Sequence, residues 1–362
     1  MAIPRARRYE RADHALHVRG SPLKVLVTGG AGYIGLELCR QLVARGDDVR
    51  VVDRFFFGRS VLPELEKVEF IPGDIRTFDP QWLDGVEVVS HLAGLSNDPT
   101  AEYNTEANWE MNAVATESLA RACKKAGVPR LIFGSSASIY DGIGAGTYDE
   151  TADVKPRGAY SLSKKFAEEK LLEAADANFS PVILRQGTVY GFSPRMRFDL
   201  VVNTFVKDAA VFGKLFLHGG GWQWRPLVDV TDVARAHIAC YLGKRDQVHA
   251  EIFNVMQENY QIRELAMLVK GSLEMKLASH RVELQETGLP KIVRDYRMTN
   301  TKMTSRLGFT PSVTVLESIN DMLQKIPLGD PTQLLHPRGY NIAWMTILEE
   351  THGTQGDFET IY

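Results

Sequence analysis

A glycine-rich segment between an apolar run and an amphipathic run constrains the fold of this chain more than any other feature. The segment VLVTGGAGYIG, residues 25–35, places Gly29, Gly32 and Gly35 in a GxxGxxG pattern. In a strand–turn–helix unit that binds a dinucleotide, the first glycine permits a tight turn, the second lets the backbone approach a pyrophosphate, and the third allows close helix–strand packing. The N-terminus of the following helix offers N–H groups and a positive dipole end to phosphates. The segment therefore predicts a dinucleotide site.

An acidic residue in the right place strengthens this interpretation. Asp53 ends the next apolar run, at 49–52. A carboxylate there accepts hydrogen bonds from the adenosine ribose hydroxyls and repels a 2′-phosphate, which favours NAD over NADP. Arg54 and Arg59 keep NADP open as an alternative, since a nearby arginine can accommodate the 2′-phosphate.

The first half of the chain alternates short apolar runs with longer helical patterns. Fully apolar strands that alternate with helices are typical of a parallel sheet covered on both faces. We therefore predict an α/β fold with a Rossmann-like doubly wound parallel sheet. The predicted strands are 25–27, 49–52, 68–71, 86–91, 131–134 and 182–185, and the predicted helices are 35–45, 105–126 and 158–177.

The composition changes after residue 191, where Gly, Pro, Trp and Arg become frequent through 193–226. Shorter elements follow, which predicts a smaller C-terminal α/β substrate lobe against the carboxyl edge of the sheet. The chain from about 329 shows no clear core pattern. We predict an N-terminal extension at 1–22, a dinucleotide-binding domain at 23–190 with returning segments from the second half, an interleaved substrate lobe at 191–328, and a C-terminal extension at 329–362.

Charge and cysteine usage limit the class of partner. The net charge of −3 provides no global positive field for nucleic acid or an anionic membrane, and no apolar run approaches the roughly 18–20 residues that span a bilayer. The first 20 residues lack the apolar stretch of a secretory signal. Cys39, Cys123 and Cys240 lie far apart in apolar helical patterns, which predicts burial, no metal site and a reducing cytoplasm.

Candidate catalytic residues follow the nucleotide segment. Tyr160 and Lys164 are four positions apart, so on a helix they share a face. We expect the ammonium to lower the pKa of the phenol, and phenolate is a useful base toward a sugar hydroxyl. A serine cluster, GSSASIY at 134–140, stands at the end of a predicted strand, where doubly wound sheets bind ligands.

Together these motifs resemble a known family. From about Lys24 to Gln324 the chain is similar to the extended short-chain dehydrogenase/reductases, particularly the sugar-nucleotide epimerases, dehydratases and reductases. The motifs that carry the resemblance are TGGAGYIG, Asp53, GDIR at 73–76, HLAG at 91–94, Asn112 with Thr116, GSSASIY, YSLSK at 160–164 and RQGTVYG at 185–191.

The resemblance implies a role for each candidate residue. It selects Ser136 from the cluster as the serine that acts with Tyr160 and Lys164. It places Asp74 and Ile75 beside the adenine, Leu92, Ala93 and Gly94 along the cofactor cleft, and Gly187 and Val189 at the nicotinamide. The full expected NAD site comprises Gly29, Gly32, Tyr33, Ile34, Gly35, Asp53, Arg54, Asp74, Ile75, Leu92, Ala93, Gly94, Asn112, Tyr160, Lys164, Gly187 and Val189.

The resemblance also implies a substrate and an assembly. Arg225, within GGGWQWRPLVD, resembles the arginine that grips the diphosphate of a nucleotide sugar, and Arg294 is the candidate for a second such arginine. Asn203 and Ser138 are expected to face the substrate. Members of the family usually pair through two helices, here the predicted 105–126 and 158–177, so we expect a homodimer.

Two residues narrow the reaction. The dehydratases of this family carry an acidic pair where this chain has Ala137 and Ser138, and the decarboxylases usually keep a glutamate at the second position. We therefore expect an NAD-dependent epimerase that acts through a transient 4-keto sugar. The alternatives are a 4-ketoreductase that consumes NAD(P)H and, from a different class, a non-catalytic nucleotide-binding regulator. The sequence specifies neither the sugar nor the nucleotide. The three phenylalanines at 55–57 fit packing over adenine, a subunit contact or the core equally well.

Overall fold

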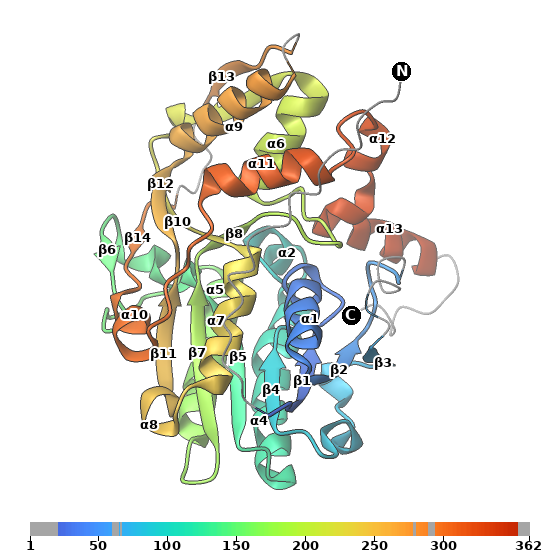
Figure 1. Cartoon of the computed structure of the whole chain (residues 1–362), viewed down its shortest axis with the longest axis vertical. Coiled ribbons are helices and arrows are strands. Elements are labelled where there is room, and N and C mark those ends of the chain that lie inside the picture. Colours follow the sequence, from blue (N-terminus) through green and yellow to red (C-terminus); the bar gives the residue numbers. More distant parts are fainter. Residues whose placement is uncertain (1–20, 60–64, 66, 278–279, 289–293, 354–362) are drawn as a thin grey trace, which may run out of the picture.

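The computed structural model describes residues 21–59, 65, 67–277, 280–288 and 294–353. Its centre is a sheet of seven parallel strands in the order β11-β7-β5-β4-β1-β2-β3 (Figure 1). These strands are short and apolar, and most of their side chains are buried because helices cover both faces. The strands are β1 (Lys24–Thr28), β2 (Asp48–Asp53), β3 (Val68–Pro72), β4 (Val88–His91), β5 (Arg130–Ser136), β7 (Ser180–Gln186) and β11 (Glu251–Val255).

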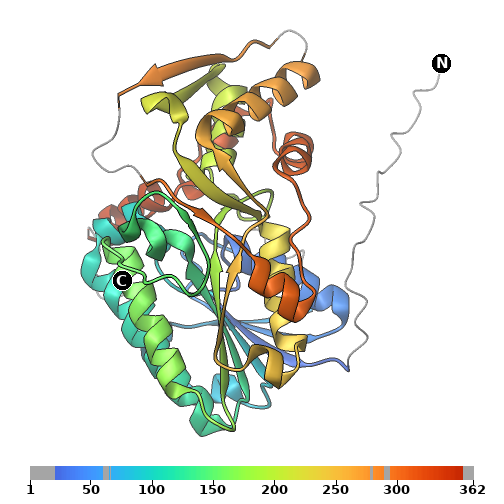
Figure 2. The same ribbon diagram turned by 90° about the vertical axis from the view of Figure 1, so that its left-hand side faces the viewer.

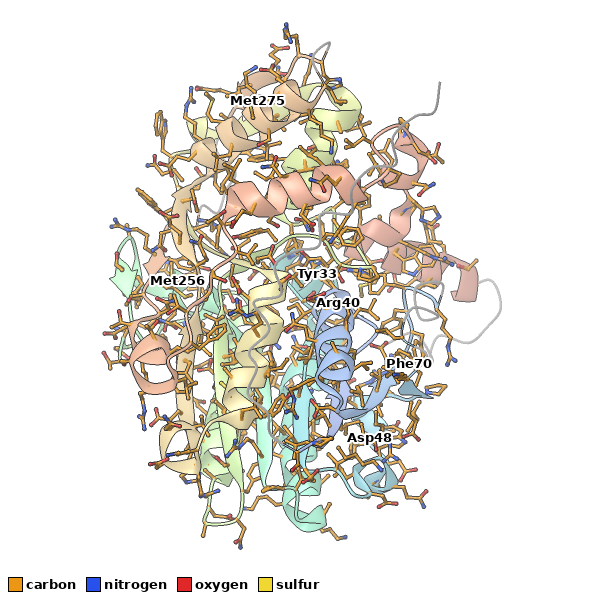
Figure 3. The ribbon with its side chains drawn as sticks, viewed as in Figure 1. Tyr33, Arg40, Asp48, Phe70, Met256 and Met275 are labelled. Atoms are coloured by element: carbon orange, nitrogen blue, oxygen red, sulfur yellow. The ribbon has the colours of Figure 1, made fainter. Side chains whose placement is uncertain are left out.

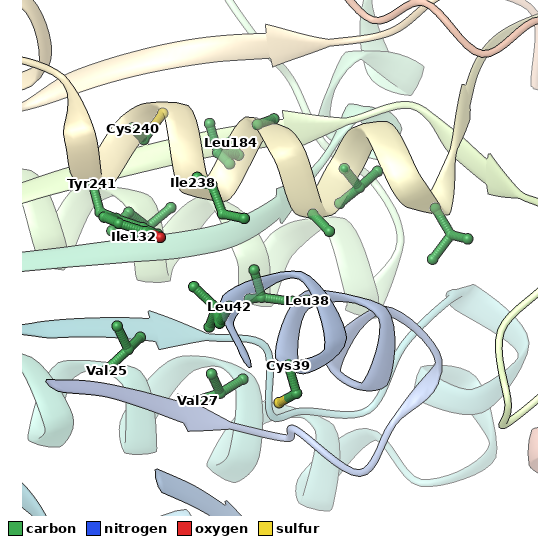
Figure 4. Close-up of a cluster of buried hydrophobic side chains, with 14 of the residues drawn as sticks. Val25, Val27, Leu38, Cys39, Leu42, Ile132, Leu184, Ile238, Cys240 and Tyr241 are labelled. Carbon is green, nitrogen blue, oxygen red and sulfur yellow. The ribbon is translucent and has the colours of Figure 1, made fainter. Parts of the chain in front are cut away.

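Two pairs of helices cover the sheet, as the alternating pattern predicts (Figure 2). On one face, α1 (Tyr33–Arg45) and α7 (Val230–Leu242) contact each other and share a buried core with the strands (Figure 4). On the other face lie α4 (Ala115–Ala126) and α5 (Ala159–Ala174). The prediction of buried thiols is confirmed, because Cys39, Cys123 and Cys240 are all free and fully buried.

One predicted helix, 105–126, is interrupted. It consists of α3 (Thr105–Trp109), a π-helical turn at Glu110–Val114, and α4. The helical prediction for 105–126 is confirmed, and the helix changes to π geometry over Glu110–Val114. The π turn contains Asn112, whose buried amide is bonded to the backbone of Leu95. Such bulges are frequent at functional sites because they direct a side chain off the regular helical ladder.

A second lobe lies beyond the carboxyl ends of the sheet strands (Figure 1). It has its own apolar core, to which three helices contribute. The lobe contains α6 (Val201–Phe212), α9 (Ile262–Lys276) and α11 (Val315–Lys325), a sheet of β8 (Thr188–Tyr190), β10 (Trp224–Asp229) and β12 (Glu258–Gln261), and the pair β9 (Lys214–His218) and β13 (Glu283–Thr287). Shorter elements are α2 (Asp98–Tyr103), β6 (Thr147–Tyr148), α8 (Arg245–Val248), β14 (Arg297–Met298) and α10 (Thr301–Leu307).

The two ends of the chain differ from one another. The expected N-terminal extension lies almost wholly outside the described residues, so its boundary stays a prediction. The segment after 329 forms α12 (Pro331–Leu334) and α13 (Asn341–Gly353), and buries Leu334 and Met345. The sequence shows no core pattern here because each of these short helices contributes isolated apolar side chains rather than a periodic stripe. Within the described residues, no helix combines the length and apolar character that crossing a membrane requires.

Candidate active site

The glycine turn between β1 and α1 is shaped for a close approach. Gly29 has a φ of +74°, and a Cβ there would lie 2.6 Å from the backbone nitrogen of Ala93. A Cβ on Gly35 would lie 2.4 Å from the Gly29 carbonyl oxygen, so α1 packs directly on the turn. Both positions require glycine, in agreement with the roles expected from the sequence.

A pocket at the carboxyl edge of the sheet gathers most of the expected cofactor residues. It lies between the glycine turn, the end of β2 and the segment after β4, and therefore has the position of a dinucleotide site in a doubly wound sheet. Of the residues predicted to bind NAD, the pocket is lined by Gly29, Gly32, Tyr33, Ile34, Gly35, Asp53, Arg54, Ile75, Leu92, Ala93 and Gly94. The residues fit NAD, since the turn leaves space for a pyrophosphate and Asp53 offers a carboxylate.

Asp53 and Arg54 point to different partners. The Asp53 carboxylate accepts the backbone N–H groups of Ala31 (3.0 Å) and Phe55 (2.7 Å), which fixes it at the end of β2. Burial raises its pKa, and these two backbone bonds oppose the rise. Arg54 forms an ion pair with Asp74 (3.2 Å), so a carboxylate already balances its charge. The arrangement favours NAD.

Six expected cofactor residues are absent from the lining of this pocket: Tyr160 and Lys164, which are described below, and Asp74, Asn112, Gly187 and Val189. Arg76 donates hydrogen bonds to the Asp74 carboxylate. Burial would raise the pKa of this carboxyl, but the bonds from Arg76 lower it overall. Asn112 holds Leu95, as described above. Gly187 donates its N–H to the Val255 carbonyl. Val189 is also buried. Their roles at the cofactor stay predictions.

The three candidate catalytic residues meet beside the end of β5. Tyr160 and Lys164 lie on the first turns of α5, and Ser136 is the last residue of β5. The Lys164 ammonium donates to the Gly134 carbonyl (3.0 Å) and lies 5.8 Å from the centroid of the Tyr160 ring. The Ser136 hydroxyl faces the phenol of Tyr160 closely enough to oppose the rise in its pKa. The sequence motifs are thus brought together from two elements.

The structure distinguishes the serines of the cluster. Ser135 donates to the buried carboxylate of Glu168 (2.5 Å), and Ser138 is buried with no hydrogen-bond partner for its hydroxyl among the described residues. Ser136 also accepts the backbone N–H of Ser138 (3.1 Å), so it caps the turn as well as contacting Tyr160. The hydroxyl that contacts the phenol therefore belongs to the serine that the family resemblance selects.

The expected effect of Lys164 on the phenol is not seen. Burial raises the pKa of Tyr160 to about 12, the charge of Asp98 adds to this, and the bond from Ser136 opposes it. Burial likewise lowers the pKa of Lys164 to about 8. The prediction that Lys164 makes Tyr160 a phenolate near neutral pH is therefore wrong for the protein groups alone, because burial disfavours the charged form of both side chains.

Two arginines and two unexpected carboxylates lie near Tyr160. Arg225 donates to the backbone carbonyl of Arg294, and Arg294 pairs with Asp98 and, at 3.7 Å, with Asp141. Both arginines were predicted from the sequence, and neither carboxylate was. Asp98 begins α2 and Asp141 follows the serine cluster, and no motif marks either one. The charge of Arg294 also lowers the pKa of Tyr160, which places these groups at one site.

Asn203 lies deeper than expected. Its amide oxygen accepts the N–H of Gly191 (3.0 Å), and its amide nitrogen donates to the Tyr33 hydroxyl (3.1 Å) and the Arg197 carbonyl (2.9 Å). These bonds hold the segment after β8 against α1. A contact between Asn203 and a substrate stays a prediction.

The described residues contain no group of three or more His, Cys, Asp or Glu that could hold a metal ion.

Comparisons with known proteins agree with this geometry. The sequence model of the NAD dependent epimerase/dehydratase family matches residues 25–255. A UDP-N-acetyl-alpha-D-glucosaminuronate decarboxylase from Bacillus cytotoxicus is 30% identical over 257 residues, which are 67% of this chain and 78% of that protein. An uncharacterized UDP-glucose epimerase from Bacillus subtilis is 31% identical over 237 residues, which are 61% of this chain and 73% of that protein. MoeE5, solved in complex with UDP-glucose and NAD, is 28% identical to this chain with a TM-score of 0.72. The match covers 83% of this chain and 97% of the MoeE5 chain.

Proposed function

We propose that this chain, which belongs to the NAD-dependent epimerase/dehydratase family and uses NAD as its cofactor, is an epimerase of a nucleoside-diphosphate sugar. The reaction runs through a transient 4-keto sugar. The two relatives support a UDP-linked sugar as the substrate class. They differ in reaction, because one is named as a UDP-glucose epimerase and the other as a decarboxylase of a UDP-linked sugar acid.

The contact between Ser136 and Tyr160 beside Lys164 is the observation that carries the proposal. The proposal is supported by a phenol, a hydroxyl and a buried ammonium that lie together at the end of β5. Oxidation of a sugar alcohol needs a base for its proton and an acceptor for its hydride. Arg197 lines the NAD pocket and its charge also acts on Tyr160, so the proposed base lies near the proposed hydride acceptor.

The mechanism assigns one role to each side chain. Tyr160, as the phenolate that the positive charges of Lys164 and of bound NAD would favour against burial, takes the proton of the sugar 4-hydroxyl, and Ser136 hydrogen-bonds the reacting oxygen. When bound, NAD supplies a positively charged ring and accepts and returns the hydride at C4. Lys164, protonated below pH about 8, holds positive charge beside the phenol. Tyr160 returns the proton after the keto sugar has turned, which completes the inversion at C4.

The residues after Ser136 favour epimerisation over elimination. Ala137 has no acid or base, and Ser138 has only a buried hydroxyl. The nearby carboxylates of Asp98 and Asp141 are both engaged by Arg294. A dehydratase needs a free acid and base at the neighbouring carbon, so we place dehydration and decarboxylation behind epimerisation.

The substrate end of the site suits a nucleoside diphosphate. Arg225 and Arg294 are adjacent through their backbone contact, and arginine forks match phosphate oxygens in charge and shape. We propose that Arg225 holds the diphosphate and that Arg294 borders it while it stays paired with Asp98 and Asp141, with Ser138 and Asn203 nearer the sugar. The alternative of a 4-ketoreductase uses the same three catalytic residues, but in one direction only.

An isotope experiment tests the reaction. The purified protein is incubated with UDP-glucose and UDP-glucuronic acid that carry deuterium at C4, without added cofactor. An epimerase converts each accepted substrate to its 4-epimer and retains the deuterium, because the hydride is returned within the site. Conversion only with added NAD(P)H, or loss of carbon dioxide or water from the sugar, would contradict the proposal. Tyr160→Phe should retain NAD but lose activity by about 10²–10⁴-fold.

A further inference from the structure

The segment after β8 lies across the glycine turn and carries Arg195 to the NAD pocket. The Tyr33 hydroxyl donates to the Gly191 carbonyl (2.7 Å), and the Ser193 hydroxyl donates to the Tyr33 carbonyl (2.7 Å). Tyr33 lies where α1 meets the second lobe (Figure 3). Two residues beyond Ser193, Arg195 lines the pocket together with the glycine turn and Asp53.

Arg195 is a buried cation with little compensation. Its side chain is 7% exposed, and burial lowers the pKa of its guanidinium to about 9. The guanidinium lies 3.5 Å above the centre of the Phe57 ring, and one of its amino groups donates to the amide oxygen of Asn341 (2.7 Å). Its Nε has no partner, and among the described residues no carboxylate forms an ion pair with it. A buried charge in this state is costly unless an anion joins it.

The two nearest carboxylates have other partners. Asp199 makes two bonds to Arg197 (both 2.9 Å). Asp53 is held by the backbone N–H groups described above, and its charge acts on Arg195 only from a distance. The missing anion must therefore come from what the pocket binds.

We infer that Arg195 binds the pyrophosphate of NAD and that Asn341, from the C-terminal helix α13, is its positioning residue. The positive N-terminal end of α1 is the phosphate site of this fold, and Arg195 is held over that turn by Ser193 and Gly191. The free Nε–H and the N–H groups of the guanidinium that Asn341 does not use are donors that match phosphate oxygens in charge.

The C-terminal helix is therefore part of the cofactor site. Asn341 is 6% exposed, and its amide nitrogen donates to the Ser96 hydroxyl (3.1 Å) on the segment after β4. The Trp344 indole donates to the Phe56 carbonyl, and Met345 lines the pocket. These contacts connect α13 to both sides of the pocket, so α13 closes over NAD as well as positioning Arg195.

Binding of two ligands to the cofactor-free protein tests Arg195. ADP-ribose contains the pyrophosphate and adenosine does not, so the ratio of their dissociation constants isolates the phosphate contact. Arg195→Gln should weaken ADP-ribose binding by about 10- to 100-fold, which is about 1.4–2.8 kcal/mol, and change adenosine binding by less than about twofold. Arg306→Gln, on α10 away from the pocket, is the matched control and should change neither. Equal weakening of both ligands, or no change, would overturn the assignment.

A separate set of variants tests the role of Asn341. Asn341→Ala should weaken ADP-ribose binding selectively in wild type but add nothing to Arg195→Gln, because it acts through Arg195. Additive losses would overturn the positioning role. If the variants do not fold, hydrogen exchange on the unmodified chain decides: ADP-ribose should protect the backbone of α13, and adenosine should not. Each readout is binding, so failure here leaves the epimerase proposal separately testable.

Discussion

At the scale of single residues, Lys164 shows that catalytic placement opposes stability. Its ammonium is 6% exposed, and burial lowers its pKa from 10.5 to about 8. Below pH about 8 the lysine is charged in both the folded and unfolded protein, so the folded state bears the full cost of burying the charge. Between pH 8 and 10.5 the folded protein binds fewer protons than the unfolded chain, so this cost fades as pH rises.

Lys164→Met should therefore stabilise the cofactor-free protein while abolishing catalysis. We expect a gain of about 2 kcal/mol in the free energy of unfolding at pH 7, less than the full pKa shift because the bond to Gly134 is lost. The gain should shrink by pH 10. Urea denaturation at the two pH values measures it, and a variant less stable than wild type at pH 7 would show that the Gly134 bond outweighs burial.

Glu168 gives a second prediction, with a pH signature. Its carboxylate is buried, pairs with Arg185 (2.8 Å) and raises the pKa of Lys164. Glu168→Gln leaves Arg185 unpaired, so we expect a loss of about 3–5 kcal/mol in unfolding free energy. It should also move the alkaline decline of activity to lower pH, because Lys164 then loses its proton earlier. An unchanged alkaline limb in pH–rate profiles would contradict this link.

Residue spacing predicts part of this site, for physical reasons. Tyr160 and Lys164 are recognisable because a helix fixes their geometry from four positions of sequence. Arg195 and Asp98 carry no such signal, since they reach the site from distant segments. The pKa of Tyr160 was expected in the wrong direction because burial depends on the tertiary structure around the phenol rather than on its sequence neighbours.

At the scale of elements, the π turn at Glu110–Val114 connects helix geometry to the cofactor pocket. It directs Asn112, whose amide oxygen accepts the Leu95 N–H (2.9 Å) and whose amide nitrogen donates to the Leu95 carbonyl (2.8 Å). The segment after β4, which includes Leu95, borders the pocket. The amide thus fixes one wall of the pocket through two backbone bonds.

Asn112→Leu should cost about 2–3 kcal/mol of unfolding free energy, because two buried backbone groups of Leu95 lose their partner. NAD affinity should fall with it, since the wall relaxes. Asn112→Asp keeps the acceptor for the Leu95 N–H, but it sets a buried oxygen against the Leu95 carbonyl and should not restore wild-type stability. Thermal melts with and without NAD measure both effects. A leucine variant with wild-type NAD affinity would disconnect the π turn from the pocket.

The strands were predictable because buried parallel strands are apolar along their whole length. β1 and β2 extend only one or two residues beyond the predicted runs. The π turn was not predictable from the sequence, because the polar residues of 110–114 fit an α-helical pattern equally well. The same holds for α13, which buries few side chains and gains its position from bonds such as that of Trp344 to Phe56.

At the scale of the whole molecule, the face formed by α3, the π turn and α5 exposes apolar side chains that a second copy could cover. Trp109 contacts Phe166 across the two helices, with ring centroids 5.0 Å apart. Trp109, Val114 and Leu162 are each more than two-fifths exposed. Apolar side chains grouped in this way mark association surfaces more often than free surface, and the family resemblance places the dimer contact on the same helices.

We therefore expect the protein to be a dimer, and Leu162→Arg combined with Val114→Arg to make it a monomer. Each arginine would place an unpaired charge at the centre of a packed apolar contact, a change that dimers of standard interface size do not tolerate. Leu316→Arg, at an equally exposed leucine on α11 of the other lobe, is the matched control and should leave the dimer intact. Light scattering after size exclusion measures the mass. A monomeric wild type would refute the assembly, and a double variant that stays dimeric would move the contact to another face. The NAD content of the monomer should be unchanged, since the pocket between β1, β2 and α13 lies within one chain.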